Sequence, residues 1–118
     1  MHSAFWDGHE QDLDSPEYAR EFAAESIRIS TIDEIIKTLD NQRAAADMSK
    51  AALARAIGSD PAMIRRLLSS SAANPTLGTL AEVAAALGMK VVLEPMTAEE
   101  RHEVTEPMLW GIATKPTI

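Results

Sequence analysis

Residues 48–68 read MSKAALARAIGSDPAMIRRLL, and this stretch decides the fold. Its first half predicts a short helix from Lys50 to Ile57. Ser49 can cap the start of that helix, and the apolar residues inside it recur on one face. Gly58 supplies the left-handed backbone conformation that commonly ends a helix.

A second helix is predicted directly after this glycine. Asp60 is suited to cap it, and Pro61 suits its first position, where a missing N–H costs nothing. Apolar residues fall on one edge of the helix, namely Ile64, Leu67 and Leu68. The remaining positions point outward, namely Ala62, Arg65 and Arg66. The stretch therefore predicts two short helices joined by a tight turn.

Helical patterns also precede this pair. Ser15, Pro16 and Glu17 form a good helix start, with a capping hydroxyl, a proline and an acid near the positive end of the helix dipole. Further along, isoleucines and a leucine recur with the spacing of one helical face, namely Ile32, Ile35, Ile36 and Leu39. The pattern leaves open whether residues 16–46 form one long helix or two.

Beyond a small-residue loop, Thr76 predicts the cap of a further helix that closes at Gly88. Its apolar face consists of Leu77, Leu80, Val83, Ala84 and Leu87. Residues 89–95 are then predicted as one β-strand that stops at Pro95. Thr97 and Glu100 form a capping box for a short helix near 98–104. Residues 105–118 contain Pro107, Gly111 and Pro116 and are expected to be a loose tail.

These elements predict an all-α bundle with an extra N-terminal helix and one β-strand after the last core helix. We expect an acidic arm and helix over residues 1–29 and the helical domain over 30–88. The strand over 89–95 follows, and then a short helix and tail over 96–118. A chain of 118 residues has room for one small core.

The chain carries a net charge of −7, which is distributed unevenly. Residues 1–25 hold seven acids against Arg20, whereas residues 43–75 hold five Lys and Arg against Asp47 and Asp60. No apolar run is long enough to span a membrane, so we expect a soluble, cytoplasmic protein. The absence of Cys excludes disulfides and thiolate metal sites. The three His residues share no metal-ligand spacing, so we expect no metal.

No pattern in the chain predicts an enzyme or a cofactor. A glycine-rich phosphate loop is missing, and no Ser, His and acid set has a plausible spacing. A binding protein is therefore favoured.

Taken together, residues 32–94 closely resemble the Cro/C1-type helix-turn-helix family. The resemblance rests on the Ser49-Lys50 entry, Leu53-Ala54, the turn at Gly58 and the aliphatic Ile64. It also rests on three later features, namely Asn74-Pro75, Thr79-Leu80 and Ala86-Leu87-Gly88. It implies a sequence-specific repressor that binds an operator in double-stranded DNA as a homodimer.

The resemblance also implies which residues contact DNA. Base edges are expected to meet Ala62, Met63 and Arg66. The sugar-phosphate backbone is expected to meet Arg43, Lys50, Arg65, Ser69 and Ser70. The alternative for the two outward arginines is an ordinary solvated helix face. Relatives often carry a polar residue where this chain has Pro61 and Ala62, so base reading by hydrogen bonds should be limited.

Two copies are usually needed to read an operator, so a dimer surface is expected. Val91 and Leu93 are the candidates, because they share one face of the predicted strand.

The acidic arm has its own pattern, with aromatic residues between the acids. We expect a protein partner to contact Phe5, Trp6, Tyr18 and Phe22. The layout is similar to HigA-type antitoxins, and this likeness implies a small basic toxin as the partner. Three alternatives remain open: a regulator without a toxin partner, a helix-turn-helix fold that binds only protein, and a first helix that packs its aromatic residues on the core.

Overall fold

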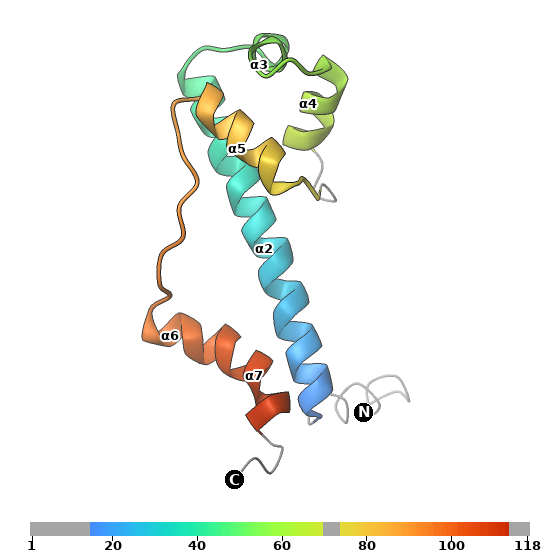
Figure 1. Cartoon of the computed structure of the whole chain (residues 1–118), viewed down its shortest axis with the longest axis vertical. Coiled ribbons are helices and arrows are strands. Elements are labelled where there is room, and N and C mark those ends of the chain that lie inside the picture. The colour runs from blue at the N-terminus through green and yellow to red at the C-terminus, as the bar shows by residue number, and fades with distance from the viewer. Residues whose placement is uncertain (1–14, 70–73, 114–118) are drawn as a thin grey trace, which may run out of the picture. The chain divides into compact units, whose positions relative to one another are not determined.

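The computed structural model describes residues 15–69 and 74–113, and helices account for most of them (Figure 1). Two compact units are present. The core unit comprises residues 30–93, and the flanking unit combines the residues up to 29 with those from 94 on. Phe5, Trp6 and Ser70 lie outside the described residues. None of the described helices is both long and apolar enough to cross a membrane.

Helix α2 (Pro16–Ala45) is one continuous helix, and it contributes residues to both units. The hydroxyl of Ser15 accepts a hydrogen bond from the N–H of Tyr18 at 2.9 Å, as expected for its cap. After Pro16 the helix contains neither proline nor glycine, so nothing in its sequence forces a break. The question that the pattern left open is thus resolved in favour of one helix.

The end of α2 is closed by Asp47, whose φ of 56° lies in the left-handed region. Its N–H donates to the carbonyl of Ala44 at 3.0 Å, and the N–H of Met48 donates to that of Arg43 at 3.1 Å. This pair of bonds is a Schellman motif. An aspartate tolerates the left-handed conformation better than most residues with a side chain, which is why it can stand where glycine is more common.

Helix α3 (Lys50–Ala56) and helix α4 (Pro61–Ser69) form the predicted pair. The hydroxyl of Ser49 accepts from the N–H of Ala52 at 3.0 Å. Gly58 has a φ of 66°, and the N–H of Ser59 returns to the carbonyl of Ala54 at 2.8 Å. The axes of the two helices cross steeply: Figure 1 shows α3 end-on and α4 from the side.

Helix α5 (Leu77–Ala86) completes the core unit. Thr76 caps it by accepting from the N–H of Thr79, and Gly88 closes it with a φ of 77°. Buried side chains from all four helices meet in one cluster: Ile36, Leu39, Leu53, Ala54, Ile64, Leu67, Leu68, Leu80, Val83, Ala84 and Leu87. The prediction fails at Leu77, which is 69% exposed because it occupies the first position of α5, one turn before the first buried residue.

The predicted β-strand is wrong. Residues 89–97 are extended, but no described residue belongs to a strand. The N–H of Met89 donates to Ala84 as part of the closure of α5, and the backbone from Lys90 to Met96 has no hydrogen-bonded partner among the described residues. The apolar sequence favours an extended chain, but a strand exists only when its backbone pairs with a neighbour.

The end of the chain differs from the predicted loose tail. Helix α6 (Ala98–Glu100) begins with the expected capping box of Thr97 and Glu100. It continues into η1 (Arg101–Thr105), a π-helical turn, and then into helix α7 (Glu106–Ala113). A proline in a regular α-helix would clash with the carbonyl four residues earlier. Here the wider π-turn directly precedes Pro107, which explains why this proline does not end the helix.

A substitution at Gly58 tests the turn between α3 and α4. A Cβ at Gly58 would meet no atom within 4 Å, so Gly58→Ala strains only the backbone. We expect it to lower the free energy of unfolding by about 1 kcal/mol in chemical denaturation. Gly78→Ala is the matched control, because Gly78 lies in α5 without a positive φ. It should raise stability by roughly 0.5 kcal/mol. Equal effects of the two substitutions would contradict the role assigned to the turn.

Candidate nucleic-acid interface

Helix α4 carries two exposed arginines opposite its buried edge. Ile64 is fully buried, and Leu67 and Leu68 are nearly so. Arg65 and Arg66 follow Ile64 directly and are exposed. Neither guanidinium forms a hydrogen bond or an ion pair with any described residue. The burial of one edge therefore presents two uncompensated positive charges on the other.

The other two predicted base contacts lie near the start of α4. Ala62 is half-buried, and its N–H donates to the carboxylate of Asp60 at 2.9 Å. Met63 is half-buried as well, and it packs against the core cluster. The structure thus places Arg66 and Ala62 on the accessible side of α4, whereas Met63 is held partly in the core.

The predicted phosphate contacts have different surroundings. Lys50 opens α3, is half-buried and makes no ion pair in the part of the chain that the structure describes. Ser69 is exposed, and its hydroxyl donates to the backbone carbonyl of Arg65. Lys50 is therefore the more available of the two for an external anion.

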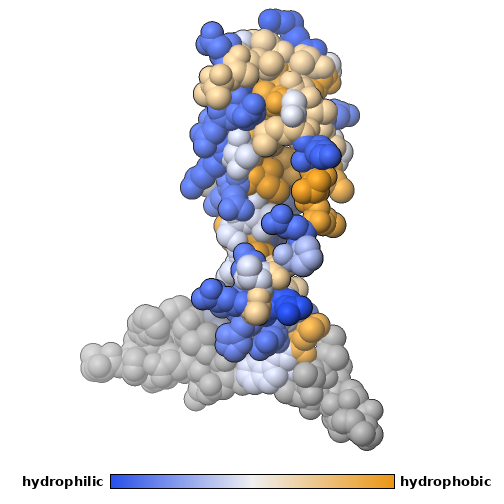
Figure 2. Space-filling model, turned by 90° about the vertical axis from the view of Figure 1, so that its left-hand side faces the viewer, coloured by the Kyte–Doolittle hydropathy of each residue, from blue (hydrophilic) through white to orange (hydrophobic). Residues whose placement is uncertain are grey.

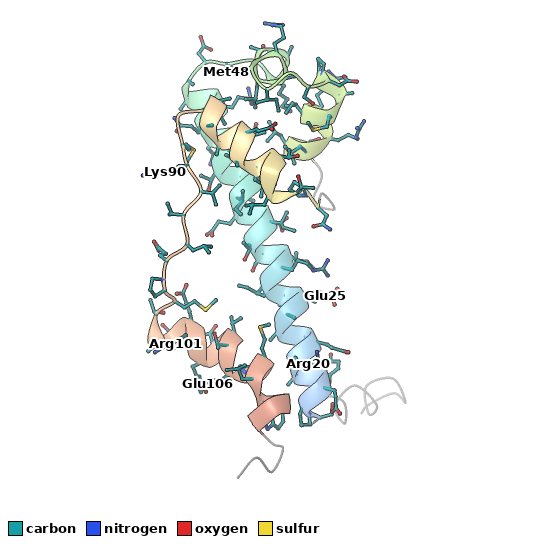
Figure 3. All side chains as sticks on the ribbon, in the orientation of Figure 1. Arg20, Glu25, Met48, Lys90, Arg101 and Glu106 are labelled. Atoms are coloured by element: carbon teal, nitrogen blue, oxygen red, sulfur yellow. The ribbon has the colours of Figure 1, made fainter. Side chains whose placement is uncertain are left out.

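Arg43 has a structural role that the sequence did not reveal. Its Nε donates to the Asp40 carboxylate at 2.9 Å, and its Nη1 donates to the carbonyl of Met48 at 2.7 Å. The side chain is only 17% exposed. Arg43 thereby fastens the turn that contains Met48, labelled in Figure 3 between α2 and α3. Its charge is balanced by Asp40, which reduces its attraction for phosphate.

Sequence reasoning also left one exposed cation of the helix pair without a role. Arg55 lies in the last turn of α3 and is exposed. Helical periodicity could have identified Arg55, because the inward positions Leu53, Ala54 and Ile57 leave residue 55 on the outer face of α3. Residues 50–66 therefore hold Lys50, Arg55, Arg65 and Arg66 against Asp60 alone.

Of the predicted dimer and partner residues, the structure describes Val91, Leu93, Tyr18 and Phe22. Val91 and Leu93 lie in the extended segment, where Leu93 is 98% exposed. Figure 2 views the molecule from the side of this segment and shows orange hydrophobic surface there among blue hydrophilic residues. In the flanking unit, the rings of Tyr18 and Phe22 lie 6.1 Å apart on successive turns of α2.

Among residues 15–69 and 74–113, no group of three His, Asp or Glu side chains is arranged to hold a metal ion. The four cations on α3 and α4 are instead suited to a polyanion.

One comparison with known proteins yields a match. A family model described as helix-turn-helix matches residues 39–92, which include α3, α4 and α5. No curated protein and no solved structure matches the chain.

Proposed function

We propose that residues 39–92, which match the helix-turn-helix family model, form a DNA-binding domain of the Cro/C1 type. The protein is then a sequence-specific repressor that reads its operator with the outer face of α4. The observation that carries this proposal is the pair of exposed, unpaired guanidinium groups of Arg65 and Arg66 opposite a buried edge. A recognition helix needs such a face to enter the major groove.

Each residue then has a separate role. Arg66 reaches a base edge, where an arginine pairs best with the O6 and N7 acceptors of guanine. Lys50 and Arg65 neutralise phosphates on either side of the groove. The N–H of Ala62 already donates to Asp60, so it is not available to bind a phosphate. At this end of α4 the small side chain of Ala62 contacts a base instead.

Two substitutions separate base reading from phosphate binding. Arg66→Ala should reduce the preference at one base pair by ~1–3 kcal/mol, because it removes a bidentate contact. Lys50→Ala should weaken binding to every sequence alike. With Lys50 and Arg65 from each copy, a dimer makes about four phosphate contacts. The plot of log affinity against log salt concentration should then have a slope of roughly −3.6, and in Lys50→Ala this slope should become shallower by about two units. A mobility-shift titration across salt concentrations measures both quantities.

Arg55→Ala is the matched control for base reading alone, because it removes an exposed charge from α3 and none from α4. It should leave base preference unchanged. Arg43→Ala is unsuitable for this purpose, since it would also break the bonds that hold the turn at Met48. Unaltered operator affinity after both Arg66→Ala and Lys50→Ala would contradict the assigned roles. Absence of any retardation at low salt would instead favour a fold that binds only protein.

Operator binding by this motif requires two copies about one DNA turn apart. For the dimer surface we propose the extended segment with Val91 and Leu93. Its apolar residues are exposed, and beside it lies a cavity of about 330 Å³. Residues from α2, α5 and the segment itself line this cavity, including Ile35, Ala84 and Val91. An exposed leucine next to an apolar cavity gives two copies a self-complementary contact.

A charge at Leu93 should disrupt this contact. We expect Leu93→Asp to convert the dimer to monomer in sedimentation experiments and to weaken operator binding accordingly. Leu77→Asp is the control, because Leu77 is also exposed in the core unit but lies outside the segment. A dimer that survives Leu93→Asp unchanged would place the interface elsewhere.

We further propose that the protein is the antitoxin of a toxin–antitoxin pair and represses its own operon. The support is the acidic flanking unit, which has twelve Asp and Glu against four Lys and Arg. In it the 57% exposed ring of Phe22 lies beside the half-buried ring of Tyr18. Aromatic residues among acids suit a basic protein partner. Phe5 and Trp6 extend the same pattern toward the N-terminus.

The neighbouring reading frame tests the antitoxin proposal. We expect a small basic protein there that stops growth when expressed alone and is neutralised by co-expression of this chain. Phe22→Asp should weaken this rescue, because it places a charge in the aromatic contact, and it should leave operator binding intact. If no such neighbour exists, the protein is a regulator without a toxin partner.

A further inference from the structure

The flanking unit contains an open apolar groove. It has a volume of about 620 Å³ and lies between the first turns of α2 and helix α7. Ala19 contributes from α2, and Pro107, Leu109 and Trp110 contribute from α7. Among the described residues that line it, two are polar, namely His102 and Glu106. Their exposed side chains are hydrogen-bonded, with Nδ1 of His102 3.0 Å from Oε1 of Glu106.

Large apolar side chains at this groove face solvent. Leu109 is 51% exposed and Trp110 is 37% exposed. On α2, Phe22 lies one turn after Ala19 and is 57% exposed. Exposed tryptophan and leucine side chains beside a hollow of this size are characteristic of a protein contact that is not yet made.

The charge of the same unit is strongly negative. Its described residues, 15–29 and 94–113, contain eight Glu against Arg20, Arg28 and Arg101. One of these acids, Glu106, lines the groove, and Figure 3 shows it on the helical stretch that also bears Arg101. The occupant of the groove must therefore approach a surface with excess negative charge.

This charge argues against two occupants from the chain itself. Residues 1–14 carry Asp7, Glu10, Asp12 and Asp14 and no Lys or Arg, so the arm would be repelled. A second copy of the same unit would be repelled for the same reason. A basic segment is attracted, and its apolar side chain can fill the hollow.

We propose that the groove between α2 and α7 binds a basic segment of another protein. An apolar anchor of that segment sits against Leu109 and Trp110, and its Lys or Arg side chains face the surrounding glutamates. This inference builds on the proposed antitoxin role, for which it supplies a docking site distinct from the DNA-binding face. The site itself can be tested without the partner.

Trp110 provides the signal for this test. The chain has two tryptophans, so Trp6→Phe leaves Trp110 as the sole indole. A short amphipathic peptide of Lys and Leu is titrated into this full-length variant. We expect saturable binding with a blue shift of the Trp110 emission, and weaker binding as salt is raised. A peptide with Glu in place of Lys should not bind.

Leu109→Asp tests the groove directly. In the Trp6→Phe background it should weaken binding of the Lys–Leu peptide about tenfold or more, because it places a charge in the apolar contact. Leu77→Asp adds the same charge at an exposed leucine of the core unit and should have no effect. Circular dichroism and operator affinity report whether each variant is folded.

Several outcomes would overturn the proposal. Equal binding of the two peptides, or binding that survives Leu109→Asp, removes the groove from consideration. A second outcome concerns the arm, residues 1–14. If replacing Phe5 and Trp6 by Asp changes the Trp110 emission when no peptide is present, the arm occupies the groove. A changed oligomeric state in Leu109→Asp identifies a second copy. If the protein binds its operator but not the Lys–Leu peptide, only the proposed groove is rejected. If it binds the peptide but not the operator, only the proposed regulator function is rejected.

Discussion

Complete burial of Ile64 is the constraint on which the DNA-binding face depends. Ile64, Leu53 and Val83 are the largest fully buried side chains, and they come from three different helices. With Ile64 fixed in this cluster, α4 cannot rotate about its axis without opening a cavity, which costs several kcal/mol in a small core. The next two residues, both arginines, are therefore held outward. Packing inside the unit determines which side chains can meet a base pair.

The sequence allows this part of the fold to be predicted because its signals are local. Ser49, Gly58 and Thr76 act through bonds to residues within one turn, and those bonds are present as expected. The extended segment after Gly88 could not be predicted in the same way. Its apolar residues specify an extended backbone, but pairing depends on a neighbour that the described residues do not supply. The π-turn before Pro107 likewise could not be predicted, because no single residue of the sequence specifies a π-turn that lets a proline stay within a helix.

The candidate site shows the same division. Exposure of Arg65 and Arg66 follows from helical periodicity, whereas the role of Arg43 depends on two groups, Asp40 and the Met48 carbonyl, that only the folded turn brings together. The family resemblance also placed Met63 at a base edge, although its half-buried side chain packs against the core. Long side chains at the border of a buried edge can go either way, and the sequence does not decide between them.

The π-turn at Arg101–Thr105 determines the direction in which each side chain of the following helix α7 points. A π-turn is equivalent to one extra residue in an otherwise regular helix, and one residue corresponds to about 100° of rotation. Leu109 and Trp110 line the groove with Ala19 only at this phase. Loss of a single residue from the π-turn would leave the composition of α7 intact and turn its indole to another side of the helix. The π-turn in the backbone, rather than any side chain, thus determines which side of α7 lines the groove.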